Sequence, residues 1–553
     1  MKKEVIIILF LVFFTNLVCA EELPDFTSLD LLGRPTENSI TINLINGEDS
    51  ISAYIEYGTQ PGIYPYSTQI QNVNSNDLLE FELTNLQPNF QYYYVLKAKN
   101  TTMQNYAISI ERNFKTKKDN YPFTFTLFTD SHIDETSQDT LTRLETLAMN
   151  SVLNDNSDLA FFLGDNIQLA ENGVGAITNV NLAIEEYNLF RNALTLSSFF
   201  TPSFFTIGNW EGEPGWETQE NITIARDLRK KFIPNPNSTT YPEGGSDHED
   251  YYAFTWGNAL FIVLNVMTHT EENPQSTENV EDWTLGQEQL DWLNTTLQNS
   301  DKPWKFIMIH HTVGGYWEGA YPWATYGRGG GYAAYVGEQA IVHQMMVDNE
   351  VQIFFHGHDH VFTNLIVDKI HYIEAGNAGH SFSFIDGYDY YIPGHGRTKV
   401  EIISDEIAKV YYINLNEEVL ADITIDRLAP RIELIYPAQN SQFRTNTKSF
   451  SFTVSDSSLV QDCSLILDGQ TEQTMDWPER DTTLQFQVND ISLGQHTWAI
   501  KCSDYSFNED GDYTIHGGQH EPNIATTETR TFKIISNPFK KPSSTIPNPP
   551  QIR

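Results

Sequence analysis

Five short polar clusters in the middle of the chain carry carboxylate, amide and imidazole groups, and each follows an apolar run. They are Asp130-Ser131-His132, Gly164-Asp165-Asn166, Gly208-Asn209-Trp210-Glu211, His310-His311 and Gly357-His358-Asp359-His360. In extended backbone, residues two apart point the same way, so Asp130 and His132 share a direction, as do His358 and His360. Imidazole and oxygen ligands of this kind suit divalent transition metals.

Each cluster alone also has an ordinary structural explanation. Gly-Asp-Asn and Gly-Asn are turn sequences, because Gly and Asn tolerate left-handed backbone and Asp bonds its own loop. The Gly-His-x-His cluster is more specific, since adjacent buried imidazoles without a metal would leave polar nitrogens unsatisfied. The five clusters taken together therefore predict one metal site.

The runs between the clusters predict an α/β domain over residues 118–424. Strands are expected at 123–128, 159–163, 204–207, 260–264, 306–309 and 351–355, and helices at 287–297 and 336–347. In such domains functional residues lie just beyond the carboxyl ends of the strands. The polar clusters stand at those positions.

Two all-β regions flank this domain, over residues 21–117 and 425–536. In the first, the run Leu86-Gln87-Pro88-Asn89-Phe90-Gln91-Tyr92 resembles the tyrosine corner of fibronectin type III sandwiches. In the second, a cysteine pair with Trp498 nearby resembles an immunoglobulin-like sandwich. The expected fold class is thus multidomain, a central α/β sandwich between two all-β sandwiches, followed by a disordered tail at 537–553.

Residues 1–20 have the features of a secretory signal peptide. Lys2 and Lys3 precede an apolar run, and Ala20 is the small residue required before cleavage. Export into an oxidising compartment would leave Cys463 and Cys502, which we expect to form a disulfide. The sequence therefore predicts a secreted protein, extracellular or periplasmic, with no membrane span.

The length and net charge of the chain limit the functions that it can have. The 553 residues are enough for about three domains. With 33 basic and 73 acidic residues the formal net charge is −40, which argues against general nucleic-acid binding. The flanking sandwiches are expected to bind cell-surface or extracellular ligands.

The order and spacing of the five clusters resemble the calcineurin-like metallophosphoesterase family over residues 118 to about 420. The family pattern runs Asp-x-His, Gly-Asp, Gly-Asn-His-Asp/Glu, His and Gly-His-x-His. The resemblance implies two metal ions, Mn, Fe or Zn, in one cup. One ion would take Asp130, His132 and His360, the other would take Asn209, His310 and His358, and Asp165 would bridge them.

This resemblance implies a phosphoric-ester hydrolase, a phosphatase or phosphodiesterase, that acts on a phosphorylated small molecule. Two ions about 3.5–4 Å apart clamp a phosphoryl group and generate a bridging hydroxide nucleophile. In the family the ligand directly ends the strand, so the resemblance favours His310 over His311 as the ligand, and neighbouring residues there are expected to face opposite ways. Asp165 is accordingly also a predicted catalytic residue.

The chain resembles the purple acid phosphatases in its fibronectin-like front domain but departs from them in the centre. Those enzymes carry Asp-x-Gly at the first cluster and a metal-bound Tyr three residues after the bridging Asp. Here the two positions are His132 and Gln168. A ferric-tyrosinate site is therefore not expected.

A second departure is Trp210, where the family usually has a His near the leaving group. Indole cannot deliver a proton at useful pH, although its N–H can bind phosphate, so Trp210 is a predicted substrate-binding residue. Three interpretations stay open. His311 or His356 replaces the acid, or the leaving group needs no proton, or the enzyme is slow or inactive.

The segment after His310 is rich in glycine and aromatic residues, and Tyr316 and Arg328 within it are predicted to contact substrate. Glu211 is expected to orient the Asn209 loop.

The alternative function is a non-catalytic, metal-stabilised cell-surface binding protein with a degenerate phosphoesterase domain. A secreted nuclease is disfavoured by the negative charge, and His380 and His395 have no predicted role.

Overall fold

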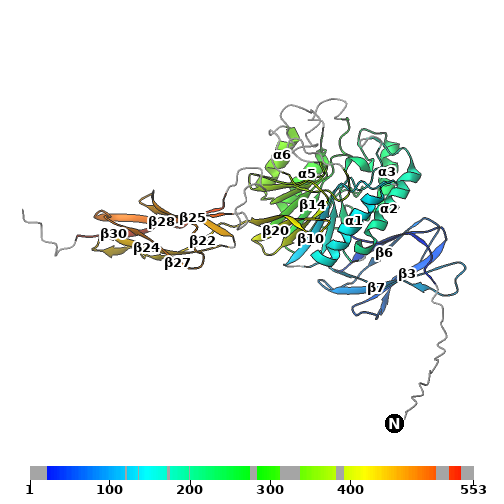
Figure 1. Ribbon diagram of the computed structural model, residues 1–553, viewed down its shortest axis with the longest axis horizontal. Helices are drawn as coiled ribbons and strands as arrows, with labels where there is room; N and C mark the ends of the chain where they lie inside the picture. Colours follow the sequence, from blue (N-terminus) through cyan, green and yellow to red (C-terminus); the bar gives the residue numbers. More distant parts are fainter. Residues whose placement is uncertain are drawn as a thin grey trace, which may run out of the picture.

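The computed structural model describes residues 22–536, apart from 119–120, 135, 171–174, 199, 274–282, 312–336, 382–390, 457 and 506–521. The signal-like segment, the loop with Tyr316 and Arg328, and the tail at 537–553 lie outside the described residues. Figure 1 shows three parts, with the N-terminal and C-terminal sandwiches against different sides of the central domain.

The N-terminal part is a sandwich of two antiparallel sheets around one apolar core. One sheet holds β1 (Phe26–Gly33), β2 (Ile40–Asn46) and β6 (Leu78–Leu83), and the other holds β3 (Ile51–Gly58), β4 (Tyr66–Ser67), β5 (Gln71–Val73), β7 (Gln91–Asn100), β8 (Ala107–Ile108) and β9 (Arg112–Lys115). The Tyr92 hydroxyl accepts the backbone N–H of Gln87 at 2.9 Å. The predicted tyrosine corner is therefore confirmed.

A buried arginine joins this sandwich to the central domain. Arg191, in helix α2 (Val180–Ser198), donates through Nη2 to the carbonyl oxygens of Leu29 and Asn43, each at 2.8 Å. A third carbonyl, that of Phe232, accepts from Nη1 at 2.6 Å. The donors on Nη1 and Nη2 are thus satisfied, which lowers the cost of burying this guanidinium, while its Nε has no partner among the described residues. The contact orients the sandwich against α2.

The central part contains two six-stranded mixed sheets packed face to face. The first has the order β12 (Ser203–Phe205), β11 (Leu159–Phe162), β10 (Phe123–Phe128), β19 (Gly396–Ile402), β20 (Ile407–Asn414) and β21 (Val419–Asp426). The second has the order β13 (Tyr252–Trp256), β14 (Ala259–Val263), β15 (Trp304–Met308), β16 (Ile353–His356), β18 (Ile370–Ala375) and β17 (Phe362–Val367). Between them Phe125 of the first sheet contacts Phe261 and Phe306 of the second, at centroid distances of 5.2 and 5.4 Å.

Helices cover the outer faces of both sheets, which gives an α/β/β/α sandwich (Figure 1). They are α1 (Gln138–Asn150), α2 and α3 (Gln219–Phe232) by the first sheet, and α5 (Gln287–Asn299) and α6 (Gly337–Asp348) by the second. Short turns of helix occur at η1 (Ser151–Asp155) and η3 (Asn209–Glu211). The predicted central α/β class is confirmed, and the described residues contain no helix of the length and apolarity needed to cross a bilayer.

The C-terminal part is a second β-sandwich. One sheet holds β22 (Arg431–Tyr436), β24 (Lys448–Ser455) and β27 (Thr483–Val488), and the other holds β23 (Ser441–Phe443), β25 (Leu459–Leu467), β26 (Gln470–Asp476), β28 (Gly494–Tyr505), β29 (Ile524–Thr526) and β30 (Arg530–Ile534). The predicted disulfide between Cys463 and Cys502 is present. It joins directly paired residues of β25 and β28 in one sheet, whereas an immunoglobulin domain bridges its two sheets.

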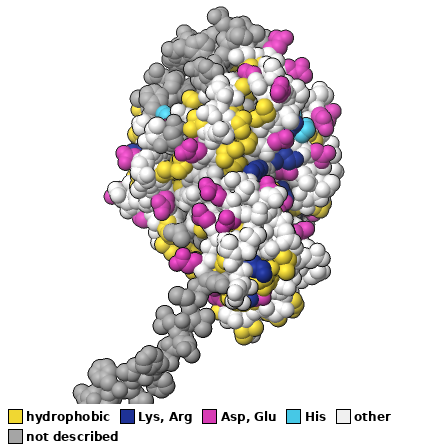
Figure 2. Space-filling model, turned by 90° about the vertical axis from the view of Figure 1, so that its right-hand side faces the viewer, with side chains coloured by type: hydrophobic (Ala, Val, Ile, Leu, Met, Phe, Trp, Pro, Cys, Tyr) yellow, Lys and Arg dark blue, Asp and Glu magenta, His cyan; other side chains and the backbone are white. Residues whose placement is uncertain are grey.

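The surface carries the negative charge expected from the composition. Acidic side chains are scattered over the face in Figure 2, while Lys and Arg gather at a few places on it. This face offers no broad basic surface to a polyanion.

Candidate metal centre

The five polar clusters converge where the carboxyl ends of strands from both sheets meet. Asp130 and His132 follow β10, and Asp165 follows β11. Asn209 begins η3 after β12, while the histidine clusters follow β15 and β16. The strands β10, β11 and β12 are parallel, as are β15 and β16, so their exits share an edge. All seven predicted metal ligands are buried there.

The backbone at these ligands is unusual. Five of the seven have left-handed conformations, namely Asp130 (φ 56°), His132 (45°), Asp165 (48°), His358 (88°) and His360 (62°). For residues with a Cβ this region costs about 1–2 kcal/mol each. Such strain persists where the surrounding structure enforces it, and it is concentrated at functional sites.

Two of the glycines in the clusters are required by close approach. At Gly164, which has φ +90°, a Cβ would lie 2.8 Å from the Cγ of His310. At Gly357 a Cβ would lie 2.8 Å from Oδ2 of Asp130. Any side chain at either position would therefore displace a predicted ligand.

One group of donor atoms is formed by Asp130, His132 and His360. The Nε2 atoms of the two histidines lie 3.2 Å apart. Oδ1 of Asp130 lies 3.2 Å from His360 Nε2 and 3.7 Å from His132 Nε2. Donor atoms around one ion with bonds of about 2.0–2.1 Å have spacings of about 3.3 Å, so this group fits a metal.

The second group lies around His310 and His358, and Asp165 stands between the two groups. His310 Nε2 is 3.2 Å from His358 Nδ1. Asp165 Oδ2 is 3.1 Å from His310 Nε2 and 3.6 Å from His132 Nε2. One carboxylate oxygen thus faces a ring nitrogen of each group, which is the placement that a bridging ligand needs.

The tautomer of His310 provides a test of the metal fit. Its Nδ1 lies 2.7 Å from the carbonyl oxygen of Leu163, which can only accept, so Nδ1 carries the hydrogen. In the neutral ring the Nε2 lone pair then faces a carboxylate oxygen of Asp165. Two facing acceptors attract only when a proton or a cation lies between them, and a backbone partner of this kind orients metal-binding histidines.

The pKa values of the buried carboxyl and imidazole groups at the site depend on one another. Burial alone would raise the pKa of Asp130, but the neighbouring His360 outweighs it and holds that pKa well below its usual range. Burial alone would lower the pKa of His310, but Asp165 raises it to about 9. Since only the neutral imidazole binds metal, a bound cation would displace the proton held at this position.

Glu211 organises the loops that carry the ligands. Its Oε2 accepts the backbone N–H groups of Gly208 at 2.7 Å and Asp165 at 3.0 Å, and its Oε1 accepts that of Asn166 at 2.8 Å. Burial and the charge of Asp165 raise its pKa to about 7. These contacts agree with the orienting role expected from the sequence.

Trp210 lies at the rim of the cup, beside the first group. Its indole is half-buried, and its ring centroid is 5.7 Å from that of His132. Its backbone N–H donates to Asp165 Oδ1 at 2.8 Å. Asn209, the preceding residue, is buried at the start of η3.

The two histidines proposed as replacement acids occupy different places. The His311 ring lies 4.5 Å from that of His358 and 4.9 Å from that of His310. The expectation that His310 and His311 face opposite ways was therefore wrong, because β15 ends at Met308 and strand alternation no longer applies. His356 is buried within β16, and burial lowers its pKa to about 4.

Sequence reasoning missed His380. Its ring lies 4.4 Å from that of His132 and 4.6 Å from that of His360, and its backbone N–H donates to the Asp130 carbonyl at 3.1 Å. It follows β18, which runs parallel to β16 and exits at the same edge. Recognition of 370–375 as a strand would have been the signal that places His380 at the site.

Comparison with known proteins agrees with this geometry. Residues 123–362 match the sequence model of the calcineurin-like phosphoesterases. Similar solved structures include a purple acid phosphatase from yellow lupin (Lupinus luteus) seeds, at 15% identity over 72% of this chain and 74% of that chain with a TM-score of 0.54. Another is PhoD, at 16% identity over 73% of this chain and 91% of that chain with a TM-score of 0.56. No curated protein sequence matched the chain.

Residues 123–362 thus match a calcineurin-like phosphoesterase domain, as the order of the clusters predicted, and this match supports a metal-dependent phosphoesterase. The two solved structures show that the fold is shared with this chain. Their low sequence identity leaves substrate and metal to be argued from the site itself.

Proposed function

We propose that the protein is a secreted phosphoric-ester hydrolase with a dinuclear metal centre. The observation that carries the proposal is the position of Asp165, with one oxygen 3.1 Å from His310 Nε2 and 3.6 Å from His132 Nε2. A single carboxylate between two ligand groups is the arrangement that holds two ions close together. Two bound ions supply Lewis-acid activation of the phosphoryl group and of the attacking water.

The assignment of ligands follows the two groups. Asp130, His132 and His360 would hold one ion and Asn209, His310 and His358 would hold the other, with Asp165 available to both. The mixture of imidazole, carboxylate and amide oxygen suits Mn, Fe or Zn. His311 lies within reach of the second group, so it either joins that ion or faces the substrate.

The chain's own residues are proposed to bind and orient the phosphate. Trp210 would offer its indole N–H from the rim beside His132. Arg328 and Tyr316, which follow His311 in the sequence and lie outside the described residues, are proposed to contact the phosphate as well. A guanidinium suits bidentate recognition of phosphate and counters the acidic surface locally. The proposed substrate is a small phosphorylated molecule.

Secretion is part of the proposal. It is supported by the signal-like residues 1–20 and by the Cys463–Cys502 disulfide, a bond that persists in oxidising compartments. The flanking sandwiches are proposed to bind cell-surface or extracellular ligands. Metal-dependent hydrolysis of p-nitrophenyl phosphate esters by the mature protein tests the enzymatic part.

We propose that His380 is the general acid that donates a proton to the leaving group, because its ring lies beside His132 and His360 on the Trp210 side of the cup. Replacement of His380 by Asn is expected to slow hydrolysis of an alkyl phosphate by about 10²- to 10⁴-fold, the usual contribution of a general acid. Hydrolysis of p-nitrophenyl phosphate should change far less, because nitrophenolate leaves without a proton. Initial rates on both substrates measure the difference.

Matched variants identify the acid among the three histidines. His311→Asn and His356→Asn are assayed in parallel. Each should either slow hydrolysis of both substrates by the same factor or leave both rates unchanged. If His380→Asn slows both equally while His311→Asn is selective for the alkyl ester, the acid is His311. If none of the three is selective, the leaving group departs without protonation.

A further inference from the structure

Three carboxylates meet where the central domain joins the C-terminal sandwich. Asp426 is the last residue of β21, Asp456 directly follows β24, and Asp504 lies near the end of β28. One oxygen from each lies within 4.8 Å of the others. The group shares no residue with the metal centre, and its members come from two different domains.

Two of these carboxylates have an oxygen that accepts no hydrogen bond in the described part of the chain. Asp426 is only 7% exposed, and its Oδ1 accepts the backbone N–H of Leu428 at 3.1 Å while its buried Oδ2 accepts none. Asp456 Oδ1 accepts from the N–H and hydroxyl of Ser458, and its buried Oδ2 likewise accepts none. A buried carboxylate oxygen without a donor is costly unless a cation neutralises it.

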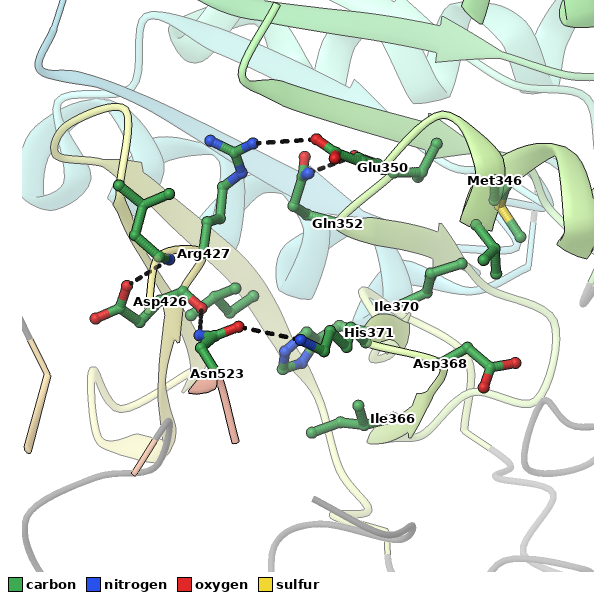
Figure 3. A pocket seen from close by; sticks show the side chains of 15 residues that line it. Met346, Glu350, Gln352, Ile366, Asp368, Ile370, His371, Asp426, Arg427 and Asn523 are labelled. Atoms are coloured by element: carbon green, nitrogen blue, oxygen red, sulfur yellow. Dashed lines mark hydrogen bonds and ion pairs between the residues drawn. The ribbon is translucent and has the colours of Figure 1, made fainter. Parts of the chain in front are cut away.

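The third carboxylate is held in place by an asparagine that also contacts the central domain. Both oxygens of the fully buried Asp504 accept from Asn523, from its backbone N–H at 2.6 Å and from its side-chain amide at 2.7 Å. The same amide donates to the carbonyl of Asp426 at 3.1 Å. Figure 3 shows Asp426 and Asn523 next to each other in a pocket of about 400 Å³ between β21 and the β17–β18 hairpin.

A nearby lysine, Lys369, offsets part of this charge at Asp504, but it forms no salt bridge with the group among the described residues. None of the salt bridges between described residues includes Asp426, Asp456 or Asp504. Burial, aided by the charge of Asp426, raises the pKa of Asp456 to about 7, and burial raises the pKa of Asp504 to about 6. The three groups therefore repel one another in the ionised form.

We propose that Asp426, Asp456 and Asp504 form a calcium site that ties the phosphoesterase domain to the C-terminal sandwich. An all-oxygen set favours a hard cation, and Ca²⁺ accepts six to eight oxygens at about 2.3–2.6 Å in flexible geometry, including water. One ligand comes from the central sheet and two come from the sandwich. The bound ion therefore fixes the junction between them.

The competing explanation is a proton shared by Asp426 and Asp456 with no metal, and calcium titration separates the two. Metal-stripped, full-length protein is titrated with Ca²⁺ by calorimetry, as wild type, Asp456→Asn, Asp426→Asn and Glu433→Gln. Glu433 is an exposed carboxylate on β22 and serves as the matched control. Because the catalytic cup is unchanged in all four proteins, any Ca²⁺ that it binds cancels in the comparison.

The proposal predicts one more Ca²⁺ per chain in the wild type and in Glu433→Gln than in either aspartate variant. Ca²⁺ should also raise the melting temperature of the wild type by about 5 °C or more, and that of the aspartate variants by less. Near-UV circular dichroism of each variant confirms that it is folded. Equal calcium stoichiometry in all four folded proteins would overturn the proposal, as would the absence of a calcium-dependent shift in the wild type.

Discussion

Replacement of Asp165 by Asn is expected to lower turnover of a phosphate ester by at least about 10³-fold while the fold is retained. The carboxylate lies between the two histidine groups, with Oδ2 3.1 Å from His310 Nε2 and 3.6 Å from His132 Nε2. Asparagine keeps an oxygen for the backbone N–H of Trp210 but removes the charge. Loss of that charge should separate the two ions or release one of them.

The measurement pairs steady-state hydrolysis of bis(p-nitrophenyl) phosphate with metal analysis of the purified variant. Asp139→Asn is a matched control, because Asp139 is an exposed carboxylate in the first turn of α1. The control should keep wild-type turnover and metal content. Wild-type turnover by Asp165→Asn with its full complement of metal would show that Asp165 does not bridge a dinuclear centre.

Replacement of Glu211 by Gln is expected to weaken metal binding by about 10- to 100-fold, the usual effect of losing a partner that orients ligands. Both Glu211 oxygens accept backbone N–H groups, from Gly208 and Asp165 at Oε2 and from Asn166 at Oε1. A glutamine must direct its amide N–H₂ at one of these donor sets. The unsatisfied buried donors should also cost about 1–3 kcal/mol of the free energy of unfolding.

Competition with a fluorescent chelator measures the change in metal affinity, and chemical denaturation of the metal-free protein measures the change in stability. Glu220→Gln, at an exposed position in the first turn of α3, removes the same charge without those contacts. We expect Glu220→Gln to match the wild type in both assays. Unchanged metal affinity in Glu211→Gln would mean that the ligand loops are held by other contacts.

The residues that the structure brings together at the site could be found in the sequence because they stand at the ends of strongly apolar strands. Runs such as 123–128 and 159–163 are recognisable without a partner, and a parallel sheet brings their exits to one edge. Among the remaining strands β17 to β21 of the central domain, β18 alone has a parallel neighbour, β16, and in the described part of the chain none of the five directly follows a helix. Their role depends on pairing across the sheet, so the loop after β18 and its His380 were not placed.

Contacts between distant segments were likewise beyond the sequence patterns. The disulfide was expected from the number of cysteines, but its position within one sheet follows from the register of β25 and β28. The proximity of His311 to His358 follows from the end of β15 at Met308. The carboxylates at the domain junction come from strands about 30 and 48 residues apart in the chain, a relation that local periodicity does not encode.

The most direct test of the central claim is hydrolysis of bis(p-nitrophenyl) phosphate and p-nitrophenyl phosphate by the mature protein, first with Mn²⁺ and then with a chelator. Nitrophenolate needs no proton to leave, so these substrates report on the metal centre whatever replaces the usual histidine at Trp210. A dinuclear hydrolase should turn over at least one of them, lose that activity with chelator and regain it with metal. Two bound metal ions with no turnover of either ester would contradict the account and favour a metal-stabilised binding protein.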